Sequence, residues 1–151
     1  MKTFGVLAAS ALMVLAQAAG VFAQEAEGAK TGQAAEAKAR IEVELNALAP
    51  SQKGCLMTFV ARNTMAAAVS KISFELAFFN EKNVVDRITV LDFRDLPVGK
   101  KRVRQFDMPG VKCDSITRII VNDTPVCEGP GPGECMQGLT TRSQLSVPFE
   151  G

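Results

Sequence analysis

Histidine, tryptophan and tyrosine are all absent from the 151 residues of this chain. Without histidine, the chain cannot form a Ser-His-Asp triad, a Cys-His nucleophile or a His-ligated zinc site. Without tyrosine it has no phenolic acid, and all nine aromatic residues are phenylalanine. Several of these phenylalanines fall at inward positions of expected strands. These absences argue against an enzyme, and we expect a noncatalytic protein without a cofactor.

A carboxylate-dependent hydrolase is the enzyme class that these absences leave open. Its candidate groups are four carboxylates on expected strands, Glu75, Asp86, Asp92 and Asp95. A glycosidase needs two carboxyl groups at a fixed separation across a sugar-binding cleft, normally with aromatic platforms beside it. Because tryptophan and tyrosine platforms are missing, we interpret these four residues as solvated carboxylates of strands and turns.

Charged residues are almost missing from residues 1–23, where Lys2 is the only one. An apolar, alanine-rich run follows it and ends in VFA, which places small or modest side chains at the positions that a signal peptidase reads. No charges that would stop transfer follow the run, which argues against a transmembrane anchor. We predict a signal peptide over residues 1–23, cleavage before Gln24 and export by the general secretory route.

An excess of positive charge is also absent. The full chain has 17 Lys and Arg against 16 Asp and Glu, so loss of Lys2 leaves a formally neutral chain. Nonspecific nucleic-acid binding usually requires a basic domain. We therefore expect no nucleic-acid partner, and no membrane span after signal removal.

Residues 24–39 contain no Val, Ile, Leu or aromatic residue, so they have nothing to bury. Two glycines, Gly28 and Gly32, disfavour a helix in this stretch. We predict a flexible Ala/Glu/Lys linker over residues 24–39.

From Arg40 onwards, apolar and polar residues alternate as they do in half-buried strands. In IEVELNAL, for example, Ile41, Val43 and Leu45 alternate with glutamates. Six more stretches are rich in β-branched or aromatic residues: CLMTFVARN, KISFELAFFN, VVDRITVLDF, KRVRQFDM, SITRIIVND and QLSVPFE. They are separated by the turn signals SQKG, NEKN, LPVG, DMPG and EGPGPG. The pattern predicts an all-β, seven-stranded antiparallel sandwich over residues 40–151.

The passage LPVGKKRVRQFDMPG resembles the Leu-Pro-x-Gly turn and following strand that recur in immunoglobulin-like and fibronectin-III-like sandwiches of exported bacterial proteins. The resemblance implies such a fold over Arg40 to Gly151. The whole chain also resembles small secreted proteins of alphaproteobacteria, which implies export and no activity. The chain departs from antibody-type domains because it has no tryptophan to pack against a disulfide.

Four cysteines, Cys55, Cys113, Cys127 and Cys135, predict two disulfides with three alternative connectivities in an exported chain. In a seven-stranded sandwich, the second and sixth strands start at the same end. Cys55 opens the expected second strand and Cys113 precedes the sixth, whereas Cys127 and Cys135 follow the sixth. We therefore predict the pairs Cys55–Cys113 and Cys127–Cys135.

The stretch GKKRVRQF places Lys100, Arg102 and Arg104 on one face of an expected strand and Lys101 on the other. Exposed strands often carry Lys and Arg because these residues discourage edge-to-edge pairing. We interpret the row as a solvated strand face. A surface for an anionic partner is the alternative.

Metal binding has little support in the sequence. Methionines and cysteines in an exported chain are the soft ligands that copper(I) prefers, but Met57, Met65, Met108 and Met136 are scattered and fit gap-filling better. Asn122 and Asp123 lack the spacing of the usual calcium loop. We expect no metal site.

These observations favour an exported, noncatalytic sandwich of the cell envelope, located in the periplasm or, alternatively, secreted. It would bind a protein, an envelope polymer or a small ligand through loops or a strand face. The alternative is a structural subunit of an envelope assembly, held through its edge strands. The sequence specifies neither the partner nor the oligomeric state.

Overall fold

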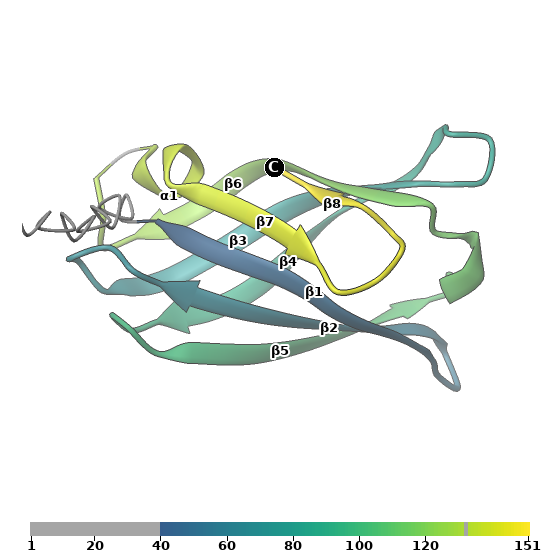
Figure 1. Cartoon of the computed structure of the whole chain (residues 1–151), viewed down its shortest axis with the longest axis horizontal. Helices are drawn as coiled ribbons and strands as arrows, with labels where there is room; N and C mark the ends of the chain where they lie inside the picture. Colours follow the sequence, from purple (N-terminus) through teal and green to yellow (C-terminus); the bar gives the residue numbers. More distant parts are fainter. Residues whose placement is uncertain (1–39, 132) are drawn as a thin grey trace, which may run out of the picture. The chain divides into compact units, whose positions relative to one another are not determined.

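The computed structural model describes residues 40–131 and 133–151, and Figure 1 shows how they are arranged. The predicted signal peptide over residues 1–23 and linker over residues 24–39 lie outside the described residues. The elements are β1 (Ile41–Pro50), β2 (Gly54–Asn63), β3 (Val69–Phe79), β4 (Val85–Leu96), β5 (Lys101–Pro109), η1 (Cys113–Ser115), β6 (Arg118–Glu128), α1 (Glu134–Gln137), β7 (Leu139–Ser143) and β8 (Phe149–Glu150).

The strands form two four-stranded sheets, which face each other across one apolar core. We call the sheet with the order β5-β2-β1-β7 sheet A, and the sheet with the order β4-β3-β6-β8 sheet B. The predicted all-β sandwich is confirmed at this level. The described residues contain eight strands rather than seven, and the pairs β1–β7 and β6–β8 are parallel. The prediction of a wholly antiparallel, seven-stranded arrangement is therefore wrong.

The prediction of one strand in QLSVPFE is also wrong. Residues 144–148 form a loop between β7 and β8. The chain turns there because the Ser143 hydroxyl accepts a 3.1 Å hydrogen bond from the Leu145 amide and donates one of 3.2 Å to the Leu145 carbonyl. Leu145 and Val147 still pack against the core from this loop, so their alternation reflects burial without a strand.

Phenylalanine rings join the two sheets at the centre of the core. The ring of Phe93 in β4 lies 5.5 Å from Phe59 and 5.1 Å from Phe106, which both belong to sheet A. It also lies 5.0 Å from Phe74 in the neighbouring strand β3, in an edge-to-face arrangement. Such aromatic pairs add stabilisation beyond the area they bury. Phe93 therefore connects both layers of the sandwich.

Both predicted disulfides are confirmed. Cys55–Cys113 joins the start of β2 to η1, and Cys127–Cys135 joins β6 to α1. Cys127 lies within β6, not in the following loop as predicted, because β6 continues to Glu128. Paired cysteines of this kind are typical of proteins outside the cytoplasm. The helical segments in residues 40–131 and 133–151 include none with the length and apolar character that a bilayer crossing requires.

Candidate functional site

Two neighbouring cavities lie where the β1–β2 turn, the β3–β4 turn and the η1 segment meet. One, of about 410 Å³, is lined by Asn80, Glu81, Lys82, Lys112, Asp114 and Ser115. The other, of about 570 Å³, is lined by residues 50–54 and 110–114. The two cavities share Lys112 and Asp114. We call the combined set, residues 50–54, 80–82 and 110–115, the loop-end site.

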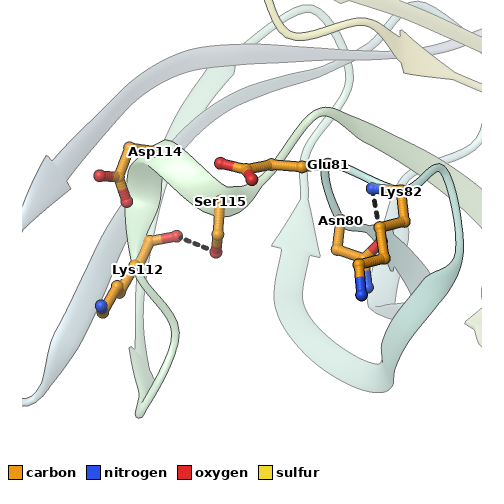
Figure 2. A pocket seen from close by; sticks show the side chains of 6 residues that line it. All are labelled: Asn80, Glu81, Lys82, Lys112, Asp114 and Ser115. Atoms are coloured by element: carbon orange, nitrogen blue, oxygen red, sulfur yellow. Dashed lines mark hydrogen bonds between the residues drawn. The ribbon is translucent and has the colours of Figure 1, made fainter.

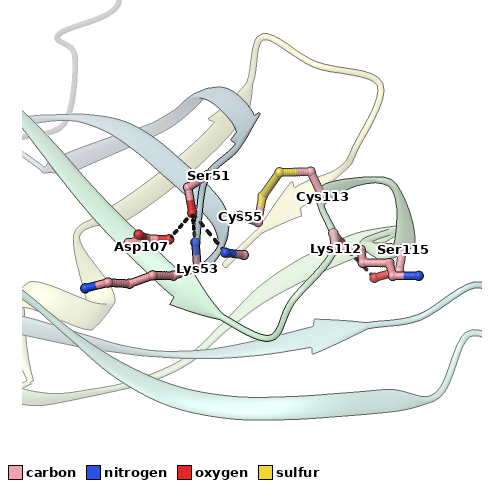
Figure 3. Close-up of a disulfide and its surroundings, with 8 residues drawn as sticks. Ser51, Lys53, Cys55, Asp107, Lys112, Cys113 and Ser115 are labelled. Atoms are coloured by element: carbon pink, nitrogen blue, oxygen red, sulfur yellow. Dashed lines mark hydrogen bonds between the residues drawn. A yellow bond between two sulfur atoms is a disulfide. The ribbon is translucent and has the colours of Figure 1, made fainter.

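The β1–β2 turn is held in shape by the hydroxyl of Ser51 (Figure 3). This oxygen accepts hydrogen bonds from the amides of Lys53 and Gly54 at 3.1 and 2.9 Å. It donates one of 2.7 Å to Asp107 in β5. The Gly110 amide in turn donates a 2.9 Å hydrogen bond to the Lys53 carbonyl. The turn is therefore fixed to the end of β5 by side-chain and backbone bonds.

Gly54 permits the close approach of these two segments. A Cβ at this position would overlap the carbonyl oxygen of Met108 and lie 3.0 Å from the Gly110 nitrogen. Residue 54 lies opposite Pro109 in the β2–β5 pairing. A glycine is thus required here for steric reasons, and it positions one wall of the larger cavity.

The wall formed by η1 is ordered by the Cys55–Cys113 disulfide and by short-range hydrogen bonds. The Ser115 hydroxyl donates a 2.7 Å bond to the Lys112 carbonyl, as Figure 2 shows. In the β3–β4 turn, the Asn80 side-chain oxygen accepts bonds from the Lys82 amide at 3.0 Å and the Val84 amide at 3.2 Å. The three segments are therefore shaped independently of any bound group.

The loop-end site presents charges of both signs. Lys53, Lys82 and Lys112 are exposed at it, together with Glu81 and Asp114. Backbone amides and carbonyls of the turns add further polar groups. Such a surface fits a polar ligand that offers both donors and acceptors, for example a peptide or glycan segment. Sequence reasoning recognised SQKG and NEKN as turns, but no sequence signal brought them together with η1.

The four carboxylates considered for hydrolysis do not form a common site. Glu75 and Asp92 share the outer face of sheet B, where Glu75 lies opposite Val90 and Asp92 lies opposite Ser73. Glu75 is bonded by the Asn122 amide, and Asp92 by the Arg94 amide. Asp86 is exposed near the start of β4, and Asp95 points to arginines instead. Neither cavity of the loop-end site is lined by any of the four.

The basic residues of GKKRVRQF lie in different environments in the structure. Lys100 is exposed and precedes β5. Arg102 and Arg104 point along the edge towards Asp95, with nitrogen-to-oxygen distances of 2.8 and 3.2 Å. Because the Arg104 side chain is only 18% exposed, the interpretation of the row as a solvated face does not hold for this residue. A surface for an anionic partner stays a prediction. Two of its three cations, Arg102 and Arg104, already form ion pairs with Asp95.

The hydrogen bond from Arg102, together with the nearby charges of Arg102 and Arg104, lowers the pKa of Asp95 below its usual range. Arg104 also donates to the backbone carbonyls of Phe93 and Asp95, at 2.6 and 3.2 Å. These contacts connect β5 of sheet A to β4 of sheet B. The arginines therefore act inside the fold, along one edge of the sandwich.

Glu44 is a buried carboxylate, although the alternation of the sequence predicted a solvent-exposed strand face for it. Gln144, Asn46 and Arg142 bond to it, with the Arg142 Nε atom 2.6 Å from Oε2. The hydrogen bonds from Gln144 and Asn46, followed by that of Arg142, lower the pKa of Glu44 against the opposing effect of burial. The alternation of β1 predicted its face correctly. Its burial comes from residues about 100 positions later, which no local signal reveals.

Methionine positions agree with gap-filling. Met57, Met65 and Met108 are buried in the core, and Met136 packs against it. Asn122 bonds to Glu75, and the Asp123 carboxylate accepts a 2.7 Å hydrogen bond from the Thr124 amide. Within residues 40–131 and 133–151, no three His, Cys, Asp or Glu side chains gather in a way that could hold a metal ion.

Comparison with known proteins gives no family for this chain. No family model matches it, and no curated protein does so either. A similar solved structure is the trimeric lipoprotein SadB of Salmonella enterica, with a TM-score of 0.43 and 15% identity. The likeness covers 49% of this chain and 42% of that one, so it spans less than half of either. A likeness at this level carries no inference about function.

Proposed function

We propose that the chain is an exported, noncatalytic module of the cell envelope that binds a polar ligand at the loop-end site. Its fold in this proposal is an immunoglobulin-like or fibronectin-III-like sandwich, and it resembles small secreted proteins of alphaproteobacteria. Residues 1–23 serve as a cleaved signal peptide and residues 24–39 as a linker. The module resides in the periplasm, with secretion as the alternative.

The observation that carries this proposal is the Cys55–Cys113 disulfide in the wall of the larger cavity. A disulfide at this place both favours an oxidising compartment and fixes η1 against β2. Rigid walls reduce the ordering cost of binding, so a ligand gains affinity from a preformed site. The mixed charges of Lys53, Lys112 and Asp114 favour a partner with both charges or with many hydroxyl groups.

Export is tested by the mass of the intact protein recovered from the periplasm or the medium. We expect a chain that begins at Gln24 and carries two disulfides. Recovery of the chain from the membrane fraction with Met1 retained would contradict the proposed export.

Binding is tested by placing a photo-crosslinking amino acid at Gln52 in the loop-end site. A matched variant carries it at Gln105, which is exposed on β5, on the outer face of sheet A. We expect crosslinked adducts with envelope proteins or glycans from position 52, and none from position 105. Equal adducts from both positions, or none from position 52, would contradict the loop-end site as the binding surface.

The noncatalytic assignment has its own test. Purified protein is incubated with isolated envelope glycan, in parallel with the double variant Glu75→Gln, Asp92→Asn. We expect no glycan fragments from either protein. Fragments that the wild type releases and the double variant does not would establish a hydrolase instead.

A further inference from the structure

The two outer faces of the sandwich differ in polarity. The outer face of sheet A carries mainly polar side chains, including Glu42, Thr58, Arg62, Gln105, Thr140 and Arg142. Among the described residues in its strands, Val103 is the large hydrophobic side chain that is exposed. An outward face of a sandwich is normally polar because it meets water. Sheet B departs from this rule.

The outer face of sheet B has an apolar centre that extends over three strands. Ala77 in β3 lies between Ile88 of β4 and Ile120 of β6. In the next rows, Phe79 lies opposite Val85, and Glu75 lies opposite Val90. We call this set the sheet-B patch: Ala77, Phe79, Val85, Ile88, Val90 and Ile120.

Three residues of the sheet-B patch, all in β4, are strongly exposed, whereas Phe79 and Ile120 are half-buried and Ala77 is 6% exposed. Ile88 is 55% exposed, Val90 is 51% exposed and Val85 is 43% exposed. Removing apolar surface of this kind from water is favourable in proportion to the area that is buried. Contiguous apolar patches on a protein surface often mark contacts with another molecule when they are large, and smaller ones fit weak contacts.

Opposite charges lie at the two ends of the sheet-B patch. At one end, the guanidinium carbon of Arg118 sits 4.0 Å from the centre of the Phe79 ring, and one of its nitrogens donates a 2.9 Å bond to Asn83. At the other end, Asp123 of β6 lies opposite Glu75 of β3. Ile120 and Ala77 belong to the same two strands and lie at the centre of the patch. The patch is therefore positive at one end and negative at the other.

We propose that the sheet-B patch binds the same patch of a second copy of this chain. In a face-to-face pair, a two-fold axis that crosses the strands at Ala77 turns the positive end of one copy onto the negative end of the other. Arg118 then faces Asp123 of the second copy, and this contact occurs twice by symmetry. Val85 likewise faces Val90, and Ile88 faces its own equivalent.

A second copy is favoured because one surface supplies both halves of the Arg118–Asp123 match. The same axis brings Glu150 of β8, which lies opposite Ile120, towards its own equivalent, and this like-charge contact weakens the pair. A rotation of this kind keeps the strands of the two sheets close to aligned, as in sheet packing generally. The proposal is independent of the proposed ligand, because the loop-end site consists of turns that the patch does not include.

The size of the sheet-B patch determines how strongly the two copies are expected to associate. Three strands about 4.8 Å apart and three rows about 6.7 Å apart give an apolar centre of about 200–300 Å² on each copy. Stable complexes bury about 800 Å² on each side. We therefore expect a weak dimer that forms in a concentration-dependent way and exchanges rapidly.

The test is sedimentation equilibrium of the exported protein over a concentration series from about 1 to 500 µM. We expect the average mass to rise from that of a monomer towards that of a dimer. The double variant Ile88→Lys, Val90→Lys should weaken the dimer by at least tenfold. The matched control is Val103→Lys, which adds a cation at a valine that is 59% exposed on the opposite outer face and should leave dimerisation unchanged.

Charge reversal tests the orientation. Arg118→Glu alone and Asp123→Arg alone should each weaken the dimer, and the combined variant should restore it, with unfolding midpoints measured to show that each variant is folded. A wild-type protein that stays monomeric at the highest concentration overturns the proposal. So does a dimer that Val103→Lys weakens as much as the patch variant, or one that the combined charge reversal fails to restore.

Discussion

The Nε atom of Arg104 donates a 2.6 Å hydrogen bond to the backbone carbonyl of Phe93. Arg104 lies in β5, an edge strand of sheet A, and Phe93 lies in β4, an edge strand of sheet B. The bond therefore joins the two sheets along one side of the sandwich. Unpaired carbonyls on an edge strand can template the addition of another strand, and here a side chain from the opposite sheet bonds to two of them, those of Phe93 and Asp95.

Replacing Arg104 with Gln should destabilise the protein, because the shorter side chain leaves the carbonyls of Phe93 and Asp95 without their donor. We expect a loss of about 1–3 kcal/mol in the free energy of unfolding, measured by urea denaturation. Lys100→Gln removes an exposed charge from the same row and should change stability by about 0.5 kcal/mol or less. Equal effects of the two variants would show that the contacts of Arg104 do not contribute.

The two disulfides should differ in their contribution to stability. Cys55–Cys113 spans 58 residues, whereas Cys127–Cys135 spans 8. On the chain-entropy model, the two bonds contribute about 4 and about 2.5 kcal/mol, respectively. Replacing Cys55 and Cys113 with Ala should therefore lower the thermal midpoint further than replacing Cys127 and Cys135. The reverse order would mean that packing around the buried Cys135 outweighs loop entropy.

Acid should destabilise the protein partly through Glu44. Gln144, Asn46 and Arg142 hold the pKa of Glu44 below its ordinary value of 4.5. The Glu44 carboxylate therefore binds a proton more readily in the unfolded chain than in the folded one. Its contribution to stability is complete above the ordinary pKa and is lost as the pH falls through the lowered pKa. In Glu44→Gln, the unfolding free energy should fall less steeply between about pH 5 and 2. A Glu44→Gln variant that keeps the wild-type slope would contradict this role of Glu44.

Replacing Gly54 with Ala should disrupt the contact between the β1–β2 turn and the end of β5. The added methyl group overlaps the Met108 carbonyl, which belongs to the backbone and cannot rotate away. We expect a loss of about 2 kcal/mol or more in the free energy of unfolding, as for overpacked sites generally. Gln52→Ala changes an exposed residue of the same turn and should cost about 0.5 kcal/mol or less. A Gly54→Ala variant as stable as Gln52→Ala would contradict the steric argument.

Much of the sandwich was predictable because five consecutive strands, β1 to β5, have an uninterrupted alternation or a run of β-branched and aromatic residues. The sixth strand was predicted too short. Its continuation beyond Asp123 contains Pro125, and proline usually ends or weakens a strand. The pairing of β3 with β6 shifts register between Ser73 and Leu76, so the proline is accommodated at an irregularity that composition does not disclose.

The candidate sites were less predictable. The alternation of residues along a strand identifies the face on which a side chain lies, but it does not identify what packs against that face. Arg104 illustrates this limit, since it lies on the inner side of an edge strand and finds carbonyls of the other sheet. The outer face of sheet B is another case. Ile88 and Val90 read as ordinary members of a strand, and their exposure follows only from the neighbours that the sheet order gives them.

The parallel pairing of β1 with β7 also bears on when the chain can fold. Ile41 lies opposite Leu139, and Phe149 of β8 lies opposite Ile119. Hairpins such as β1–β2 can form early, but neither sheet obtains its last strand until the C-terminal residues are available. Contacts so distant in sequence slow folding. A chain that is made from its N-terminus therefore closes neither sheet until β7 and β8 are available, and its four cysteines, which all precede β7, can exchange partners until then.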